Sequence, residues 1–503
     1  MTRFLPQLFA LALLATHVSA QTTNFTIIDS PNATNSANNH LNGVTALSPT
    51  DVWAVGFFSI DSFRTLAMHW DGTAWTITPT PDPSQPNTDQ LKKVVAFASN
   101  DVWAIGGHGL SYSFRWDGVQ WIQVPMPPVN NRGFTNVINY LDDIAGATPN
   151  DIWAVGSMDS LEGGTWTLTM HWDGVQWTQV PSPNQPTPSG SFYSQALQAV
   201  VAVASNDVWA VGYYRVGNTE HPLIEHWDGT KWSIVAAPDS PAGDGWLHGI
   251  AAAGPNDIWA VGEYQKTDFN TMAKGLTMHW DGTRWSVFIP PNPSPFGVNP
   301  LNSVTAHGPN DFYAAGQWET SSQGLSTYIV HWNGANWSQV SSQDMPGTGT
   351  GWNQLLDIAT DSSGGMWTVG SKQSSFGSPT FTLVERSTAA APPPPTPTPP
   401  PPTPTPPPPT PTPTPTPTPI ADRVSITRAE YIVSKKQLRV DATSSSAQAV
   451  MKTYVTSTNA FIGTLTNNGG GKYSGQFSLA TNPQNITVRS SLGGTATKAV
   501  TAK

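Results

Sequence analysis

The residues best suited to chemistry recur at one position of an internal repeat, directly after the Leu of a Leu-x-x-Val-x-Ala unit. In chain order this position holds Asn42, Lys92, Asp142, Gln198, His248, Asn302 and Leu356. The next position adds Lys93, Asp143, Ser303 and Asp357. These amide, ammonium, carboxylate and imidazole groups bind polar ligands, and His248 beside Asp142 or Asp143 would allow general acid–base catalysis. The alternative is the solvated lining of a channel.

A second candidate set consists of aromatic residues in segments that differ between the copies of the repeat. The set comprises Phe57, Phe58, Tyr112, Tyr213, Tyr214, Trp246, Tyr264, Trp318 and Trp352. Exposed aromatic rings stack on the C–H faces of sugars, while neighbouring amides and carboxylates bind the hydroxyls. Tyr214, Tyr264 and Trp318 are therefore candidates for ligand binding. The same rings could instead cover the ends of sheets.

Two motifs that recur in most copies indicate scaffold rather than chemistry. Asn-Asp precedes Val-Trp, and such side chains bond nearby backbone amides and set tight turns. Trp-Asp-Gly is typical of a hairpin turn in which Gly takes a positive φ. A His precedes it in most copies, but histidines in separate copies lie too far apart to share a metal. The tryptophans are expected to pack between sheets, and no metal or cofactor is predicted.

The repeat predicts the architecture. Its Asp stands at Asp51, Asp101, Asp151, Asp207, Asp257 and Asp311, and a degenerate seventh copy has Gly365-Met366-Trp367 instead. Each copy contains four short strand candidates, which is the content of one propeller blade. The seventh copy has three, and residues 24–31 match the fourth strand of other copies. We therefore predict an all-β, seven-bladed β-propeller in which the N-terminal strand completes the last blade and covers its edge.

The spacing within the repeat separates constant from variable connections. Leu41 lies ten residues before Asp51, and His69 lies six before Trp75; both distances recur in other copies. The connections before and after these segments vary in length. Since they are expected to meet on the opposite face of the disc, ligand-binding residues are predicted on that variable face.

Composition divides the chain into four parts. Residues 1–20 resemble a signal peptide, with Arg3, an apolar run and a Val-Ser-Ala cleavage site, so we expect a secreted, extracellular protein without a transmembrane segment. Residues 21–390 form the propeller. Residues 391–419 form an extended Pro/Thr linker. Residues 420–503 are expected to form a small β-sandwich of immunoglobulin-like type.

Charge and cysteine content limit the partners. The chain has no Cys, which excludes disulfides and thiolate chemistry. Residues 420–503 contain ten Lys and Arg against three Asp and Glu, whereas the rest contains 13 against 30. An acidic propeller is a poor binder of nucleic acid. The basic tail could contact an anionic surface, or be simply a soluble domain.

The Leu-x-x-Val-x-Ala, Asp-Val-Trp-Ala-Val-Gly and Trp-Asp-Gly-Thr-x-Trp units resemble those of secreted bacterial propellers related to the kelch and tectonin groups. The resemblance covers roughly Gln21 to Arg386. Departures include the absent kelch Gly-Gly doublet and a repeat longer than the tectonin unit. The resemblance implies a propeller and, by analogy with tectonin-like proteins, glycan binding.

These observations favour a secreted, non-catalytic binding protein that recognises a glycan or another surface ligand on the variable face. One alternative is a polysaccharide lyase or glycoside hydrolase that uses His248 and the carboxylates of Asp142, Asp143 and Asp357 at the channel mouth. Another is a structural cell-surface scaffold that binds a protein partner.

Overall fold

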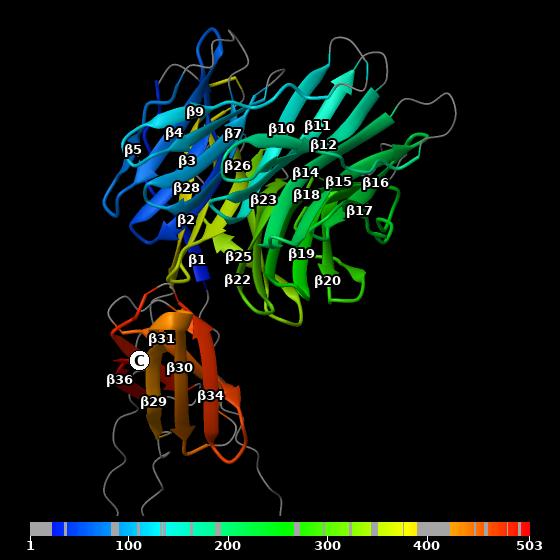
Figure 1. Cartoon of the computed structure of the whole chain (residues 1–503). Coiled ribbons are helices and arrows are strands. Elements are labelled where there is room, and N and C mark those ends of the chain that lie inside the picture. The colour runs from blue at the N-terminus through cyan, green and yellow to red at the C-terminus, as the bar shows by residue number, and fades with distance from the viewer. Residues whose placement is uncertain are drawn as a thin grey trace, which may run out of the picture. The chain divides into compact units, whose positions relative to one another are not determined.

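The computed structural model describes residues 23–389 and 423–503, and the chain divides into two compact units, Met1–Thr396 and Pro397–Lys503 (Figure 1). Within these ranges, the residues left undescribed are 35–37, 82–89, 108–110, 131–132, 134–136, 161–163, 187–192, 266–271, 295–296, 321–323, 344–350, 376, 447–448, 457–460, 480 and 491–493. The expected signal peptide and Pro/Thr linker lie outside the described residues.

The first unit consists of successive groups of strands that pair antiparallel in chain order. The first groups are β2 (Asn38–Ser48), β3 (Asp51–Ser59), β4 (Phe63–Trp70) and β5 (Trp75–Ile77), then β6 (Leu91–Ala98), β7 (Asp101–Gly106), β8 (Tyr112–Trp116) and β9 (Trp121–Val124). The next are β10 (Ile138–Thr148), β11 (Asp151–Ser160), β12 (Gly164–Trp172) and β13 (Trp177–Val180), then β14 (Tyr193–Ala204), β15 (Asp207–Val216), β16 (Thr219–Trp227) and β17 (Trp232–Ile234). These are followed by β18 (Asp244–Gly254), β19 (Asp257–Gln265), β20 (Lys274–Trp280) and β21 (Trp285–Phe288), then β22 (Leu301–Gly308), β23 (Asp311–Glu319), β24 (Leu325–Trp332) and β25 (Trp337–Ser342). The last are β26 (Trp352–Thr360), β27 (Met366–Gln373) and β28 (Phe381–Ala389).

The first strand of each group contacts the first strand of the next. These contacts run from β2 through β6, β10, β14, β18 and β22 to β26, and β26 contacts β2 again. A closed ring of inner strands with sheets radiating outward is the arrangement of a β-propeller. The chain is almost wholly β: the one helix in the described residues is the 3₁₀ turn η1 (Val433–Lys435).

The ring is closed by the N-terminal strand β1 (Thr23–Ile27), which pairs antiparallel with β28 over five residues. β1 also makes a short parallel pairing with β25 of the preceding group. The pairing with β28 is the one that the match between residues 24–31 and other fourth strands predicts. Phe25 is buried against Tyr313, Leu355 and Leu383, so this strand contributes to the core as well as covering an edge.

The repeated tryptophans pack between neighbouring sheets, as the sequence predicts. Trp53 of β3 lies 4.9 Å from Trp116 and 5.5 Å from Trp121 of the following sheet, measured between ring centroids. The Trp-Asp-Gly turns are also confirmed: Gly72 takes a φ of 98°, which favours glycine. Each such ring removes a large apolar surface from water.

The Asp that precedes Val-Trp is a scaffold residue, but its partners differ from the predicted turn amides. Asp51 Oδ1 accepts hydrogen bonds from His69 Nε2 at 2.9 Å and from the Trp53 indole at 3.2 Å. His69 stacks on the same indole, with 4.3 Å between centroids. The motif therefore connects the second and third strands of one sheet through a half-buried Asp–His pair that contacts a buried Trp.

The second unit contains two sheets. One has the order β33-β34-β30-β29-β37, and the other β32-β31-β35-β36. Their bounds are β29 (Val424–Ile432), β30 (Gln437–Ser444), β31 (Met451–Val455), β32 (Phe461–Thr464), β33 (Thr466–Asn467), β34 (Lys472–Ser478), β35 (Asn485–Ser490), β36 (Thr495–Ala499) and β37 (Thr501–Ala502). Both sheets contribute to one core, with Leu438 and Val440 from the first and Met451, Ile486 and Val488 from the second.

Candidate functional site

The candidate residues after the repeat Leu occupy the same structural position in every sheet. Between Leu41 and Gly43 the register with β3 shifts, and Asn42 is the extra residue of a β-bulge. The same shift leaves these equivalents unpaired: Lys92, Asp142, Gln198, His248, Asn302 and Leu356. All of these side chains are half-buried. The bulge therefore repeats the same placement on each inner strand.

Several of these side chains bind neighbouring sheets instead of facing solvent freely. Asn42 donates from Nδ2 to the Leu91 carbonyl at 2.7 Å. Asn302 makes the equivalent bond to the Leu355 carbonyl, also at 2.7 Å, and a second to Gln317. These amides link one inner strand to the next, so much of their hydrogen-bonding capacity is already used.

The position after the bulge residue contributes charged side chains to a buried network. Asp357 accepts hydrogen bonds from Val44 N at 2.8 Å, Ser303 Oγ at 2.6 Å and Lys93 Nζ at 2.6 Å. Asp143 accepts from the backbone amides of Ile144 and Val200, each at 2.8 Å. Burial raises the pKa of Asp143 to about 6, although Lys93 opposes this shift. Both carboxylates thus hold inner strands together, which is a structural role.

His248 has partners other than the aspartates that the sequence suggests. Its Nδ1 lies 2.5 Å from Gln198 Oε1 and therefore donates, because an amide oxygen only accepts. Its Nε2 lies 3.6 Å from a carboxylate oxygen of Glu263. Burial raises the pKa of Asp142 to about 6, and Lys92 opposes this shift. His248, Gln198 and Glu263 thus form a half-buried polar group, and Asp142 interacts electrostatically with Lys92.

The aromatic candidates are not brought together. Tyr214, Tyr264 and Trp318 each follow the second strand's Gly by two residues, in β15, β19 and β23. Each is half-buried and packs against a different hydrophobic cluster. Tyr214 also stacks on His221, with 5.2 Å between centroids. These three rings cover separate sheets and do not form a common stacking surface.

A hollow of about 380 Å³ combines an exposed aromatic ring with polar side chains. Trp352, which is 40% exposed, lies at the start of β26. The hollow is lined by Asn38, His40, Trp352, Gln354, Ser371, Gln373, Gly377 and Thr380. We call it the Trp352 pocket. Its lining comes from the beginning of the first sheet and from the last sheet, which the ring closure makes neighbours.

Three amides of the Trp352 pocket are each fixed at one end. Asn38 accepts from the Thr380 amide at 3.1 Å through Oδ1. Gln354 donates from Nε2 to Ser371 Oγ at 2.8 Å, and Gln373 donates from Nε2 to the Ser378 carbonyl. Among the described contacts, the Asn38 Nδ2 donor and the two Oε1 acceptors have no further partner. The pocket therefore offers one oriented donor and two oriented acceptors.

The Trp352 pocket carries no charge near neutral pH. His40 stacks on Phe57, with 4.7 Å between centroids, and Nε2 lies 3.0 Å from Thr380 Oγ1. Burial lowers the pKa of His40 to about 4, so the imidazole is neutral above that pH. The sequence indicated Trp352, but His40 and Gln354 were missed. Both directly precede the repeat Leu. The residue type at this position varies between copies, as it does at the bulge position.

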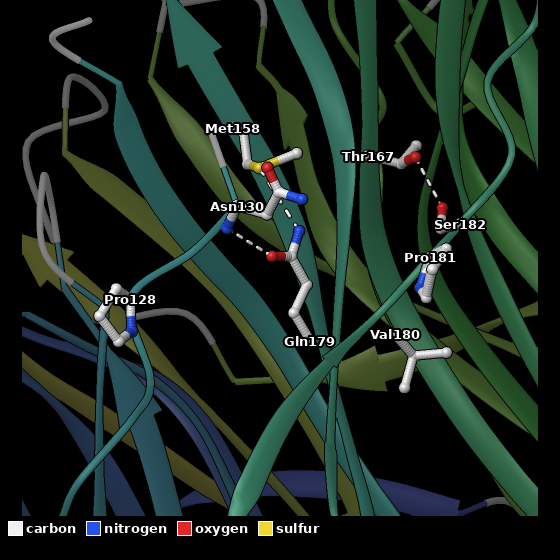
Figure 2. Close-up of a pocket in the computed structure, with 8 residues that line it drawn as sticks. All are labelled: Pro128, Asn130, Met158, Thr167, Gln179, Val180, Pro181 and Ser182. Atoms are coloured by element: carbon white, nitrogen blue, oxygen red, sulfur yellow. Dashed lines mark hydrogen bonds between the residues drawn. The ribbon is translucent and has the colours of Figure 1, made fainter. Parts of the chain in front are cut away.

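A second pocket, of about 490 Å³, lies on β11, β12 and β13 (Figure 2). Figure 2 shows that its polar groups bind one another: Gln179 accepts from the Asn130 amide at 2.6 Å and donates to the Met158 sulfur at 3.7 Å. The Thr167 and Ser182 hydroxyls lie 2.6 Å apart. Because these polar groups are hydrogen-bonded to one another, this pocket leaves fewer donors and acceptors for a polar ligand than the Trp352 pocket does.

The described residues include no cluster of three or more His, Asp or Glu side chains that could hold a metal. They also include no helix with the length and hydropathy needed to cross a bilayer.

No protein-family model and no curated protein matches the chain. Among similar solved structures, the six-bladed β-propeller lectin of Aleuria aurantia is 15% identical, with 62% of this chain and 98% of the lectin covered and a TM-score of 0.37. YCF48 bound to D1 peptide is 12% identical over 59% of this chain and 91% of its own, with a TM-score of 0.34. Because both TM-scores lie below 0.5, the assignment of a propeller rests on the strand contacts of this chain.

Proposed function

We propose that the chain is a secreted, non-catalytic binding protein whose propeller, of seven blades, recognises a neutral glycan in the Trp352 pocket. The observation that carries the proposal is one uncharged hollow that contains an exposed indole and three side-chain amides. Each amide is hydrogen-bonded at one end only. An indole face stacks on the C–H face of a pyranose, and oriented amides bind its hydroxyls. Asn38 would donate to a sugar hydroxyl, and Gln354 and Gln373 would accept from others.

The absence of charge in the pocket lining supports a neutral sugar. The lining contains only amides, hydroxyls, Trp352 and a His40 whose pKa is lowered to about 4. An anionic sugar would need a cation to balance the cost of removing its charge from water. A neutral pyranose needs only hydrogen bonds and an apolar platform.

Trp352→Ala is expected to weaken glycan binding at least about tenfold, the equivalent of about 1.4 kcal/mol, because it removes the stacking platform. A glycan array with the intact chain identifies the ligand, and titration calorimetry measures the affinity of both proteins. Tyr264→Ala is the matched control, since it removes an aromatic ring of another sheet outside the pocket. Loss of affinity in the control with normal binding by Trp352→Ala would place the site elsewhere.

Catalysis at the channel mouth is a second candidate, favoured by the half-buried pair of His248 and Glu263 and, separately, by the carboxyl of Asp142. A carboxyl whose pKa burial raises to about 6 can donate a proton near neutral pH. Release of oligosaccharides from a polysaccharide panel by the parent, with none by His248→Ala, would establish this activity. Product release that is unchanged in His248→Ala would assign the chemistry to other residues.

A further inference from the structure

The rings of His40, Phe57 and Phe63 form a continuous path from the wall of the Trp352 pocket to the surface of the first sheet. His40 is one of the residues that line the pocket. Its imidazole stacks on Phe57, with 4.7 Å between centroids and 13° between the ring planes. Phe57 in turn contacts Phe63 edge to face, with 5.2 Å between centroids. Phe57 therefore connects the pocket wall to Phe63.

The register of β2, β3 and β4 places these side chains on one face of the sheet. The pairing of β2 with β3 sets His40 opposite Phe57 and Asn38 opposite Ser59. The pairing of β3 with β4 sets Ser59 opposite Phe63. Because residues two apart on a strand share a face, these two rows lie side by side. The diagonal contact of Phe57 with Phe63 is one that aromatic side chains can span.

The outer end of this path is exposed. The exposed fraction is 37% for Phe63 and 63% for Ile60, which lies in the turn between β3 and β4. Ser59, the last residue of β3, is half-buried, and its hydroxyl has no hydrogen-bond partner among the described contacts. We call Phe57, Ser59, Ile60 and Phe63 the Phe63 platform.

The Phe63 platform offers the same combination of groups as the Trp352 pocket, an exposed aromatic ring beside hydrogen-bonding groups. Asn38 lies at the junction of the two, because it lines the pocket and pairs with Ser59. A sugar chain that leaves the pocket past Asn38 would therefore meet Ser59 and Phe63 next. Arg64 follows Phe63 on β4 and so points to the opposite face, which leaves the platform uncharged.

We propose that the Phe63 platform is a second subsite beside the Trp352 pocket, and that the ligand is a linear chain of neutral sugars rather than one terminal sugar. One sugar would occupy the pocket, and the next would stack on Phe63 with a hydroxyl bonded to Ser59 Oγ or Asn38 Nδ2. The proposal rests on glycan binding in the pocket. Insertion of this turn into a bilayer fits less well, because it would take the exposed Asp61 carboxylate, next to Ile60, out of water at a high cost.

The experiment is titration calorimetry of the full chain with β-linked oligomers of glucose, mannose, galactose and xylose, each from the monomer to the hexamer. In a series that binds, the parent is expected to gain at least about tenfold in affinity from monomer to trimer. Phe63→Ala is expected to lose this gain and to keep the affinity for the monomer within about twofold, with an unchanged melting temperature. Ile77→Ala is the matched control, since Ile77 is 40% exposed on β5 of the same sheet and lies outside the platform. This control and Phe63→Trp, which keeps an aromatic ring, are both expected to retain the gain.

Equal affinities of the parent for monomer and trimer would overturn the second subsite and leave the Trp352 pocket as the site of glycan binding. A gain that survives in Phe63→Ala would also overturn it, because the longer chain would then leave the pocket in another direction. Self-association of the parent that Phe63→Ala abolishes, without any dependence on sugar chain length, would assign the platform to a second copy of the chain. If no series binds at any length, the proposed function fails for these sugars and the second subsite fails with it.

Discussion

Lys93→Ala is expected to lower the free energy of unfolding of the propeller by about 3–5 kcal/mol, since it leaves buried carboxylates without their cation. Lys93 Nζ lies 2.6 Å from Asp357 Oδ1, and the exposed fractions of the two side chains are 19% and 6%. Burial lowers the pKa of Lys93, but the carboxylates of Asp357 and Asp143 outweigh this effect and raise it. Urea unfolding followed by tryptophan fluorescence measures the loss.

Lys92→Ala is the matched control for this prediction. Lys92 is the half-buried neighbour of Lys93, and no ion pair of the described structure involves it, so its removal is expected to cost less than about 1 kcal/mol. In the double variant Lys93→Ala/Asp357→Asn, the second change is expected to cost less than it does alone, because the unpaired charge is gone. Equal costs for Lys92→Ala and Lys93→Ala would contradict the role of the network.

The repeat predicted the strands because its period reflects a local requirement that each sheet meets separately. Most sheets of the propeller have a turn with Gly at positive φ, as at Gly72, and a buried tryptophan, as at Trp53. The degenerate seventh copy also buries a tryptophan, but with different partners. Asp361 accepts from the Trp367 indole at 3.3 Å, and Arg386 lies 4.7 Å over the same ring, at the register position of the histidines.

The candidate site was harder to predict, because it depends on contacts between sheets. The polar ring of the sequence separates into bulge residues, which are half-buried, and the following residues Asp143, Ser303 and Asp357, which are buried. A difference of one position along the inner strand decides whether a side chain lies in the bulge or at the position after it. The spacing of residues in the sequence does not reveal a bulge. The Trp352 pocket joins segments around residues 38 and 352–380, which only ring closure brings together.

A buried carboxyl couples stability of the propeller to pH. Glu225 on β16 is fully buried, and its Oε2 accepts a hydrogen bond from Ser182 Oγ at 3.0 Å. Burial raises the pKa of Glu225 from the ordinary 4.5 to about 8, although the Ser182 bond opposes this shift. The folded protein therefore keeps this proton up to about pH 8, whereas the unfolded chain releases it near pH 4.5. Since the folded state binds more protons in this window, this carboxyl lowers the free energy of unfolding as pH rises from 4.5 to 8.

Glu225→Gln is expected to remove this contribution, because glutamine stays neutral and its amide oxygen can still accept from Ser182. The variant should match the parent near pH 4.5 and exceed it at pH 8 by on the order of 3 kcal/mol in free energy of unfolding. Urea unfolding at pH 4.5, 6.5 and 8 measures the difference. Ser182→Ala removes the bond that stabilises the carboxylate and raises the pKa of Glu225 further, so its loss of stability should continue to a higher pH than that of the parent. If the difference in free energy of unfolding between Glu225→Gln and the parent stays constant with pH, Glu225 is already ionised in the folded state.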